Sequence, residues 1–140
     1  MAVTSKANAV WTGSLKDGSG QAKLSSGSEH QFTWKARAEQ GGSTTPEELI
    51  AGAHSACYSM ALSNELHDAG FASESVAVSA EVDFDISQGG ITQIRLSVEA
   101  SVPEIDQAKF EEIANAAKDG CPVSKALAGT EIVLSSATLV

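Results

Sequence analysis

Hydrophobic and polar residues alternate most clearly in the middle of the chain, at residues 76–102. Apolar side chains occupy every second position of 76–86 and again of 94–102, with a glycine-rich segment at 88–90 between the two runs. A period of two is typical of a strand with one buried and one solvated face, and glycines between two such runs favour a turn. The pattern therefore predicts an antiparallel hairpin with one face on the core.

A long helix is predicted at residues 46–69, before this hairpin. Thr45 suits the N-cap, Pro46 suits the first helical position, and Glu48 completes a capping box. Gly70 suits the position just after the last turn. The first two thirds of the helix are apolar nearly all round and rich in Ala, Gly and Ser. We expect such a helix to be buried centrally, where small side chains let other backbones approach closely.

Shorter elements precede and follow these two features. Loose alternation predicts three strands, at 7–13, 21–26 and 30–37. After the hairpin the pattern predicts a helix from Asp106 to Gly120, a short helix from Cys121 to about residue 129, and a last strand at 131–140. The order is βββ–α–ββ–αα–β. We expect a single α+β domain over residues 1–140, with antiparallel sheets around the long helix.

Composition and charge exclude several classes of protein. Apolar residues make up 42% and charged residues 19% of the chain, which excludes intrinsic disorder. There are 9 basic and 18 acidic residues, and no basic run, so we expect no nucleic-acid partner. No apolar run reaches the ~18 residues that span a bilayer, so we expect no membrane association. Without a signal-peptide pattern, we expect a cytoplasmic protein whose mature chain begins near residue 1.

Two cysteines are the first candidates for chemistry. Cys57 lies in the middle of the long helix, and Cys121 directly precedes Pro122 at the start of a short helix. A lone helical cysteine is most often a small buried apolar residue. The unpaired N–H groups at a helix start instead favour a thiolate at Cys121. The cysteines and three histidines match no zinc-binding spacing, so we expect no metal.

His54 supports a different chemistry. It lies three residues before Cys57, so the two side chains share a helix face and could form the Cys–His pair of a hydrolase or acyltransferase. A packed structural histidine is the more common explanation, because no carboxylate lies nearby in sequence to orient the ring. A third interpretation is a non-catalytic binding domain in which both cysteines are inert.

Two charged residues near the long helix are not explained by capping. Glu48 closes the capping box, whereas Glu47 is not needed for it. The sequence has only two arginines, Arg37 and Arg95, and Arg37 lies nine residues before Pro46 at the end of a predicted strand. A guanidinium is always charged and matches a carboxylate geometrically, although a strand-end arginine can also be simply solvated.

Three segments carry a family resemblance. TTPEELI at 44–50 precedes AHSACYSMAL at 53–62, and GCPVS occupies 120–124. Together they closely resemble the two signatures of the OsmC/Ohr family of thiol-dependent hydroperoxide reductases, nearer to the OsmC branch, and the order of elements agrees. Thr45 stands where asparagine is usual before the proline, and both residues cap helices well.

The resemblance implies roles for four residues and no cofactor. Cys57 matches the peroxidatic cysteine, Cys121 the resolving cysteine, Glu47 the site glutamate and Arg37 the arginine of the OsmC branch. It implies that the Cys57 thiolate attacks organic hydroperoxides, and H2O2 more weakly, and becomes a sulfenic acid. Condensation with Cys121 then gives a disulfide, which a dithiol reductant such as a lipoyl protein resets. Arg37, held by Glu47, keeps the thiolate ionised.

The geometry of the long helix predicts an intertwined homodimer. Glu47 and Cys57 are ten residues apart, which is about 15 Å along a helix and beyond the reach of a glutamate side chain. Either the helix breaks near Gly52, or Glu47 of one chain lies beside Cys57 of another. A single sheet also covers only one side of an apolar helix, which leaves a large patch for a second chain.

Overall fold

The computed structural model describes residues 1–140 and places them in two units, Met1–Leu49 and Ile50–Val140. We call these the N-terminal unit and the C-terminal unit. Together they contain the predicted α+β elements and one further helix. The prediction of one domain over the whole chain stays a prediction.

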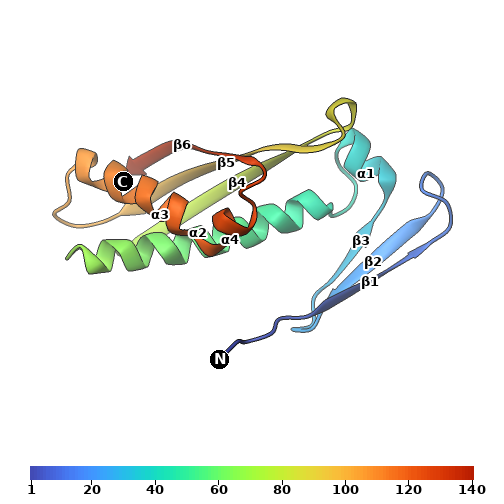
Figure 1. Ribbon diagram of the computed structural model, residues 1–140, viewed down its shortest axis with the longest axis horizontal. Coiled ribbons are helices and arrows are strands. Elements are labelled where there is room, and N and C mark those ends of the chain that lie inside the picture. The colour runs from blue at the N-terminus through green and yellow to red at the C-terminus, as the bar shows by residue number, and fades with distance from the viewer. The chain divides into compact units, whose positions relative to one another are not determined.

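The N-terminal unit is built on a small antiparallel sheet (Figure 1). Its strands pair in the order β1-β2-β3, with the bounds β1 Ala7–Thr12, β2 Ser19–Leu24 and β3 Glu29–Phe32. Helix α1 (Trp34–Glu39) follows the sheet. The three predicted strands are therefore confirmed in number, and they lead into α1.

The predicted third strand is too long, because the chain turns into α1 after Phe32. Thr33 has extended backbone angles, and its Oγ1 accepts a hydrogen bond of 3.1 Å from the N–H of Ala36. That bond satisfies one of the unpaired N–H groups of the helix, which favours α1 over continued alternation. Arg37 consequently lies in the last turn of a helix, not at a strand end.

Helix α2 (Pro46–Asp68) is the predicted long helix, and it is unbroken. At its start, Thr45 Oγ1 accepts a 3.0 Å hydrogen bond from the N–H of Glu48. At its end, Gly70 has φ of 92°, a conformation that favours glycine, and its N–H donates to the carbonyl of His67. The break near Gly52, one of two geometries considered from the sequence, is absent in this chain.

The C-terminal unit contains the predicted hairpin. β4 (Ser75–Asp85) and β5 (Gly90–Ser101) pair antiparallel, joined by the 3-10 turn η1 (Ile86–Gln88). β6 (Glu131–Leu139) pairs with β5 in the parallel direction, so this sheet is mixed rather than antiparallel throughout. The crossover between these parallel strands contains α3 (Gln107–Gly120) and α4 (Pro122–Ala126), the two helices predicted there.

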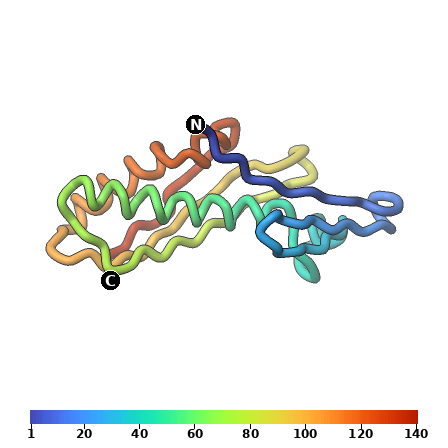
Figure 2. The backbone as a smooth tube through the Cα atoms, turned by 90° about the horizontal axis from the view of Figure 1, so that it is seen from below, coloured from blue at the N-terminus to red at the C-terminus, as the bar shows by residue number.

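Helices α2 and α3 cover one face of this sheet (Figure 1 and Figure 2). The core between them is continuous and almost wholly apolar. Its fully buried large side chains come from all three elements: Tyr58, Leu62, Leu66, Ile94, Leu96, Val98 and Phe110. The alternation in β5 therefore confirms the prediction that one face of this strand packs on the core. Cys121, at the end of α3, belongs to the same core.

Only one stripe of α2 is buried in the single chain. The stripe recurs every four residues, at His54, Tyr58, Leu62 and Leu66. Positions on another side, including Met60 with 72% of its surface exposed, are open. A single sheet thus covers only one side of α2, as expected from the sequence for one chain, and the other side stays open. No helix of the structure is long and apolar enough to span a membrane.

Candidate active site

The two cysteines meet inside the C-terminal unit although 64 residues separate them in sequence. Cys57 is half-buried on α2, and Cys121 is fully buried at the N-cap of α4. Both thiols are free, and their Sγ atoms lie 3.0 Å apart in a thiol–thiol hydrogen bond. An oxidised sulfur on one residue is thus within immediate reach of the other.

The two thiols interact strongly and titrate as a pair. Burial raises the pKa of the Cys57 thiol, the neighbouring Cys121 raises it further, and the N–H of Val123 acts in the opposite direction. Burial also opposes ionisation of Cys121. Hydrogen bonds from the Cys57 thiol and from Ser124 and Val123 nevertheless bring the pKa of the Cys121 thiol below its ordinary value. The Cys57 thiol is the largest contributor that favours ionisation of Cys121, and the first turn of α4 adds to it.

His54 is bonded to Ser124, not to Cys57. Its ring is fully buried, with Nε2 2.7 Å from Ser124 Oγ and no hydrogen-bond partner on Nδ1. Burial lowers the pKa of His54, which favours the neutral ring. The Cys–His pair considered from the sequence is not formed, because the face shared by His54 and Cys57 meets α4, whose Ser124 hydroxyl takes the ring nitrogen.

Ser124 is the residue of this site that the sequence did not single out. It is itself buried, and it stands three residues after Cys121, so the first turn of α4 brings its hydroxyl back toward the cap. There it helps to lower the pKa of the Cys121 thiol. The signal that could have identified Ser124 in the sequence is a hydroxyl three residues after a cysteine at a helix N-cap.

Arg37 and Glu47 form a tight ion pair within the N-terminal unit. Arg37 Nε and Nη2 both donate to Glu47 Oε1, at 2.9 and 2.7 Å. The pairing of these two residues agrees with the prediction. The two nitrogens of the guanidinium share this one carboxylate oxygen. Glu47 is 5% exposed, so the arginine compensates a nearly buried charge.

The second arginine, Arg95, is held elsewhere. It lies on β5 between two core residues, so it points from the opposite face of the sheet. Its Nη2 donates to Asp83 Oδ1 at 2.9 Å, and Glu81 also accepts from it. The guanidinium holds the pKa of the Asp83 carboxyl below its usual value. Arg95 therefore links β5 to β4 on the outer face of the hairpin.

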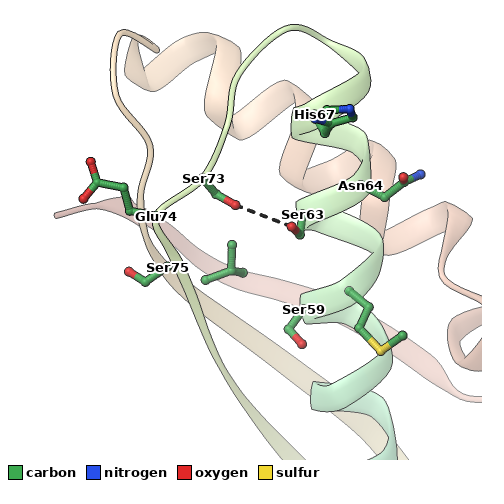
Figure 3. A pocket seen from close by; sticks show the side chains of 9 residues that line it. Ser59, Ser63, Asn64, His67, Ser73, Glu74 and Ser75 are labelled. Atoms are coloured by element: carbon green, nitrogen blue, oxygen red, sulfur yellow. Dashed lines mark hydrogen bonds between the residues drawn. The ribbon is translucent and has the colours of Figure 1, made fainter.

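A separate hollow of about 610 Å³ lies between α2 and the start of β4 (Figure 3). Its lining is mostly polar, and the Ser63 and Ser73 hydroxyls face each other across 3.5 Å. Neither cysteine lines it: the residues are Ser59, Met60, Ser63, Asn64, His67, Ser73, Glu74, Ser75 and Val76. The hollow therefore lies apart from the thiol pair. No three His, Cys, Asp or Glu side chains are grouped to hold a metal ion.

Comparison with known proteins extends these observations. The family described as OsmC-like protein matches residues 39–135. The chain is 42% identical over 131 residues to peroxiredoxin OsmC of Escherichia coli, covering 91% of this chain and 92% of that relative. It is 31% identical over 92 residues to organic hydroperoxide resistance protein OhrB of Bacillus subtilis, covering 61% and 63%. An OsmC like protein from Mycoplasma pneumoniae shares the fold, with a TM-score of 0.75 at 18% identity over 100% and 99% of the two chains.

Proposed function

Because the chain belongs to the OsmC family, we propose that it is a thiol-dependent peroxidase that reduces organic hydroperoxides to alcohols through Cys57 and Cys121. The names of the relatives, a peroxiredoxin and an organic hydroperoxide resistance protein, confirm the predicted class of enzyme. The observation that carries the proposal is the 3.0 Å distance between the two free sulfurs.

The reaction proceeds in two steps on sulfur. The Cys57 thiolate attacks the terminal peroxide oxygen, the O–O bond breaks, and the alkoxide takes up a proton and leaves as alcohol. Cys57 is then a sulfenic acid. The Cys121 sulfur attacks the Cys57 sulfur, the S–O bond breaks, and water leaves as the disulfide forms. A dithiol such as a lipoyl protein returns both residues to thiols by exchange through a mixed disulfide.

Organic hydroperoxides suit this site better than H2O2, which we expect to react more weakly. The side of α2 that carries Cys57 forms a small and apolar wall that includes Ala61, one turn further along the helix. An alkyl group gains burial against such a wall, whereas H2O2 gains none.

The ionisation of Cys57 requires a positive charge that its own surroundings do not provide. Burial raises the pKa of this thiol, and a nearby guanidinium lowers a thiol pKa and offsets charge on the leaving oxygen. We assign this role to Arg37. Its tight contact with the nearly buried Glu47 supports the assignment, because the pair fixes the guanidinium in one orientation.

The active unit that we propose is a homodimer with residues from both chains in each site. Glu47 and Cys57 are about 15 Å apart along the unbroken α2, so one helix does not bring them together. An antiparallel partner helix places Glu47, with Arg37, beside Cys57 of the partner subunit. The open side of α2, which exposes Gly52, Ala53, Ala56 and Met60, offers the small-residue surface that such a partner needs.

Two other functions remain distinguishable by experiment. A Cys–His hydrolase needs His54 as a base for Cys57, and the bond from His54 to Ser124 argues against it. A non-catalytic binding domain needs two inert thiols, and the 3.0 Å contact between the two free sulfurs and the lowered pKa of the Cys121 thiol argue against it.

Mass spectrometry after one equivalent of cumene hydroperoxide tests the proposal. We expect a disulfide between Cys57 and Cys121 in the wild-type protein, which a dithiol removes. The matched control is Cys121→Ser, in which the same dose leaves a trappable sulfenic acid on Cys57. A hydrolase shows no disulfide and keeps its activity in Cys121→Ser. Inert thiols show no oxidation, and both alkylate slowly at equal rates; either result contradicts the proposal.

A further inference from the structure

A buried cluster of polar side chains joins the cysteine pair to a histidine that the reaction scheme does not use. The Cys57 and Cys121 sulfurs are 3.0 Å apart, Ser124 stands three residues after Cys121 in the first turn of α4, and Ser124 Oγ lies 2.7 Å from His54 Nε2. All four residues belong to the C-terminal unit. Cys121 and His54 are 0% exposed and Ser124 is 7% exposed, so water does not compete for these bonds.

The other nitrogen of His54 indicates that the ring is not there for packing. Nδ1 is buried and has no hydrogen-bond partner. A buried polar atom without a partner costs stability, and an apolar ring of similar size fills the same space without that cost. The interaction that distinguishes a histidine from such a ring here is the Nε2 bond to Ser124.

We propose that His54 and Ser124 are positioning residues for the resolving thiol: they orient the Cys121 sulfur and stabilise its thiolate for attack on oxidised Cys57. This inference rests on the proposed peroxidase function and adds two residues to it. Neither residue touches the peroxide, and both act through Cys121.

The direction of the bonds follows from the number of protons available. A serine hydroxyl has one proton to donate and accepts through its lone pairs. When that proton points at the Cys121 sulfur, Ser124 Oγ accepts from the N–H on His54 Nε2, and the unpaired Nδ1 carries the lone pair. The neutral ring thus polarises a hydroxyl that stabilises negative charge on sulfur.

The resolving step balances without a proton change on either residue. The Cys121 thiolate forms the S–S bond, and the S–O bond of the Cys57 sulfenic acid breaks. The departing hydroxide takes the proton that Cys121 gave up and leaves as water. His54 and Ser124 donate hydrogen bonds throughout, so a neutral histidine is sufficient.

Tyr58, the other buried hydroxyl beside Cys121, does not compete for this role. Its hydroxyl donates to the carbonyl of Ala114 at 2.8 Å. Burial raises the pKa of Tyr58, and the charge of a Cys121 thiolate adds to the effect, so the phenol stays protonated and bound to that carbonyl. Ser124 is therefore the hydroxyl that supports the sulfur.

Single-turnover kinetics separate this role from a purely structural one. Reduced protein is mixed with one equivalent of cumene hydroperoxide and quenched with an alkylating reagent, and mass spectrometry follows Cys57 sulfenic acid and then the disulfide. For Ser124→Ala we expect sulfenic acid formation within about twofold of wild type and disulfide formation at least about tenfold slower, as loss of a hydrogen bond to a charged group predicts. His54→Phe, which keeps the ring volume, slows the same step by about threefold or more.

Two further variants serve as controls. Ser124→Thr retains a hydroxyl at the same position and restores disulfide formation relative to Ser124→Ala. Ser55→Ala removes a hydroxyl that bonds only to the carbonyl of Gly52 in its own helix, and it leaves both steps unchanged. With excess peroxide, Ser124→Ala also accumulates more sulfinic acid, because its sulfenic acid survives longer.

The outcomes separate this inference from the function on which it rests. Wild-type rates of disulfide formation in both Ser124→Ala and His54→Phe overturn the inference and leave the peroxidase intact. Equal slowing of both steps shows a general structural defect and also overturns it. If the wild-type protein forms no disulfide, the proposed function fails, and the inference fails with it.

Discussion

The two units of the molecule differ most in what each buries. The C-terminal unit has a continuous core of large side chains from α2, α3 and its sheet. In the N-terminal unit the buried apolar residues are two alanines, Ala22 and Ala36, and every residue of β1 is exposed. By area arguments, burial of two alanines contributes little to stability.

The candidate site residues are divided between the same two units. The two free sulfurs lie in the unit with the core, 3.0 Å apart. The ion pair of Arg37 and Glu47 lies in the N-terminal unit, which has no such core. The geometry of the cysteine pair is therefore held by the packing of its own unit. The charged pair belongs to a unit whose exposed apolar residues, such as Val10 and Leu15, are consistent with cover from a second chain.

The largest effect is expected within the C-terminal unit, from its two cysteines. Cys57→Ser should abolish peroxide turnover, because no other residue forms the sulfenic acid. Cys121→Ser should allow one rapid stoichiometric reaction and then progress to sulfinic acid. Consumption of peroxide over many cycles with a dithiol reductant measures both. Multiple turnovers by Cys121→Ser at the wild-type rate contradict a resolving role.

The next effect tests whether the N-terminal unit supplies the charge. Arg37→Ala should raise the pKa of the Cys57 thiol, since a cation no longer favours the thiolate, and slow peroxide reduction by about 10²-fold. The pH dependence of iodoacetamide alkylation and the peroxidase rate measure these changes. Arg95→Ala is the matched control and should change neither. An unchanged pH dependence of alkylation for Arg37→Ala, or a shifted one for Arg95→Ala, would show that the role was assigned to the wrong arginine.

A third prediction compares the packing of the two units directly. Phe110→Ala removes a fully buried ring from the C-terminal core and should lower the free energy of unfolding by about 3–5 kcal/mol. Leu15→Ala, at a position 56% exposed, should change it by less than about 0.5 kcal/mol in dilute protein. Urea unfolding measures both. If Leu15→Ala lowers the free energy of unfolding as much as Phe110→Ala, the two units do not differ in packing. Leu15 is then covered by another surface.

A smaller effect is expected from mixing inactive chains. Cys57→Ser and Glu47→Ala chains each lack one half of the proposed site. If Glu47 acts on Cys57 of the partner subunit, each mixed dimer regains one intact site and part of the wild-type activity. Native mass spectrometry verifies that mixed dimers form. Mixed dimers without recovered activity place both residues in one chain, and a fully active monomer in light scattering removes the dimer proposal.

Local signals in the sequence were sufficient for most elements of the fold. Thr45, Pro46 and Gly70 fix both ends of α2 through capping, which depends only on neighbours in the chain. The same chemistry explains the error at residues 30–37. Thr33 is also a helix cap, and its bond to Ala36 outweighs the loose alternation that suggested a strand.

The remaining features depend on contacts between distant parts of the chain. A strand pattern carries no direction, so the parallel pairing of β6 with β5 was not predictable from periodicity. The cysteine pair was expected only through the family resemblance, since spacing alone does not join Cys57 to Cys121. The bond between His54 and Ser124 joins residues 70 positions apart, and only the packing of α4 against α2 creates it.

The last prediction concerns a pH dependence confined to the C-terminal unit. Burial lowers the pKa of His54 below its ordinary value of 6.5, so below that pH the unfolded chain binds a proton that the folded chain resists. Stability from the neutral ring is therefore complete above pH 6.5 and is lost as the pH falls, by at most about 1.4 kcal/mol per pH unit. Urea unfolding between pH 7.5 and 5.5 should show this loss in the wild-type protein and a shallower one in His54→Phe. Equal slopes for wild type and His54→Phe show that His54 is protonated in the folded chain, contrary to its burial.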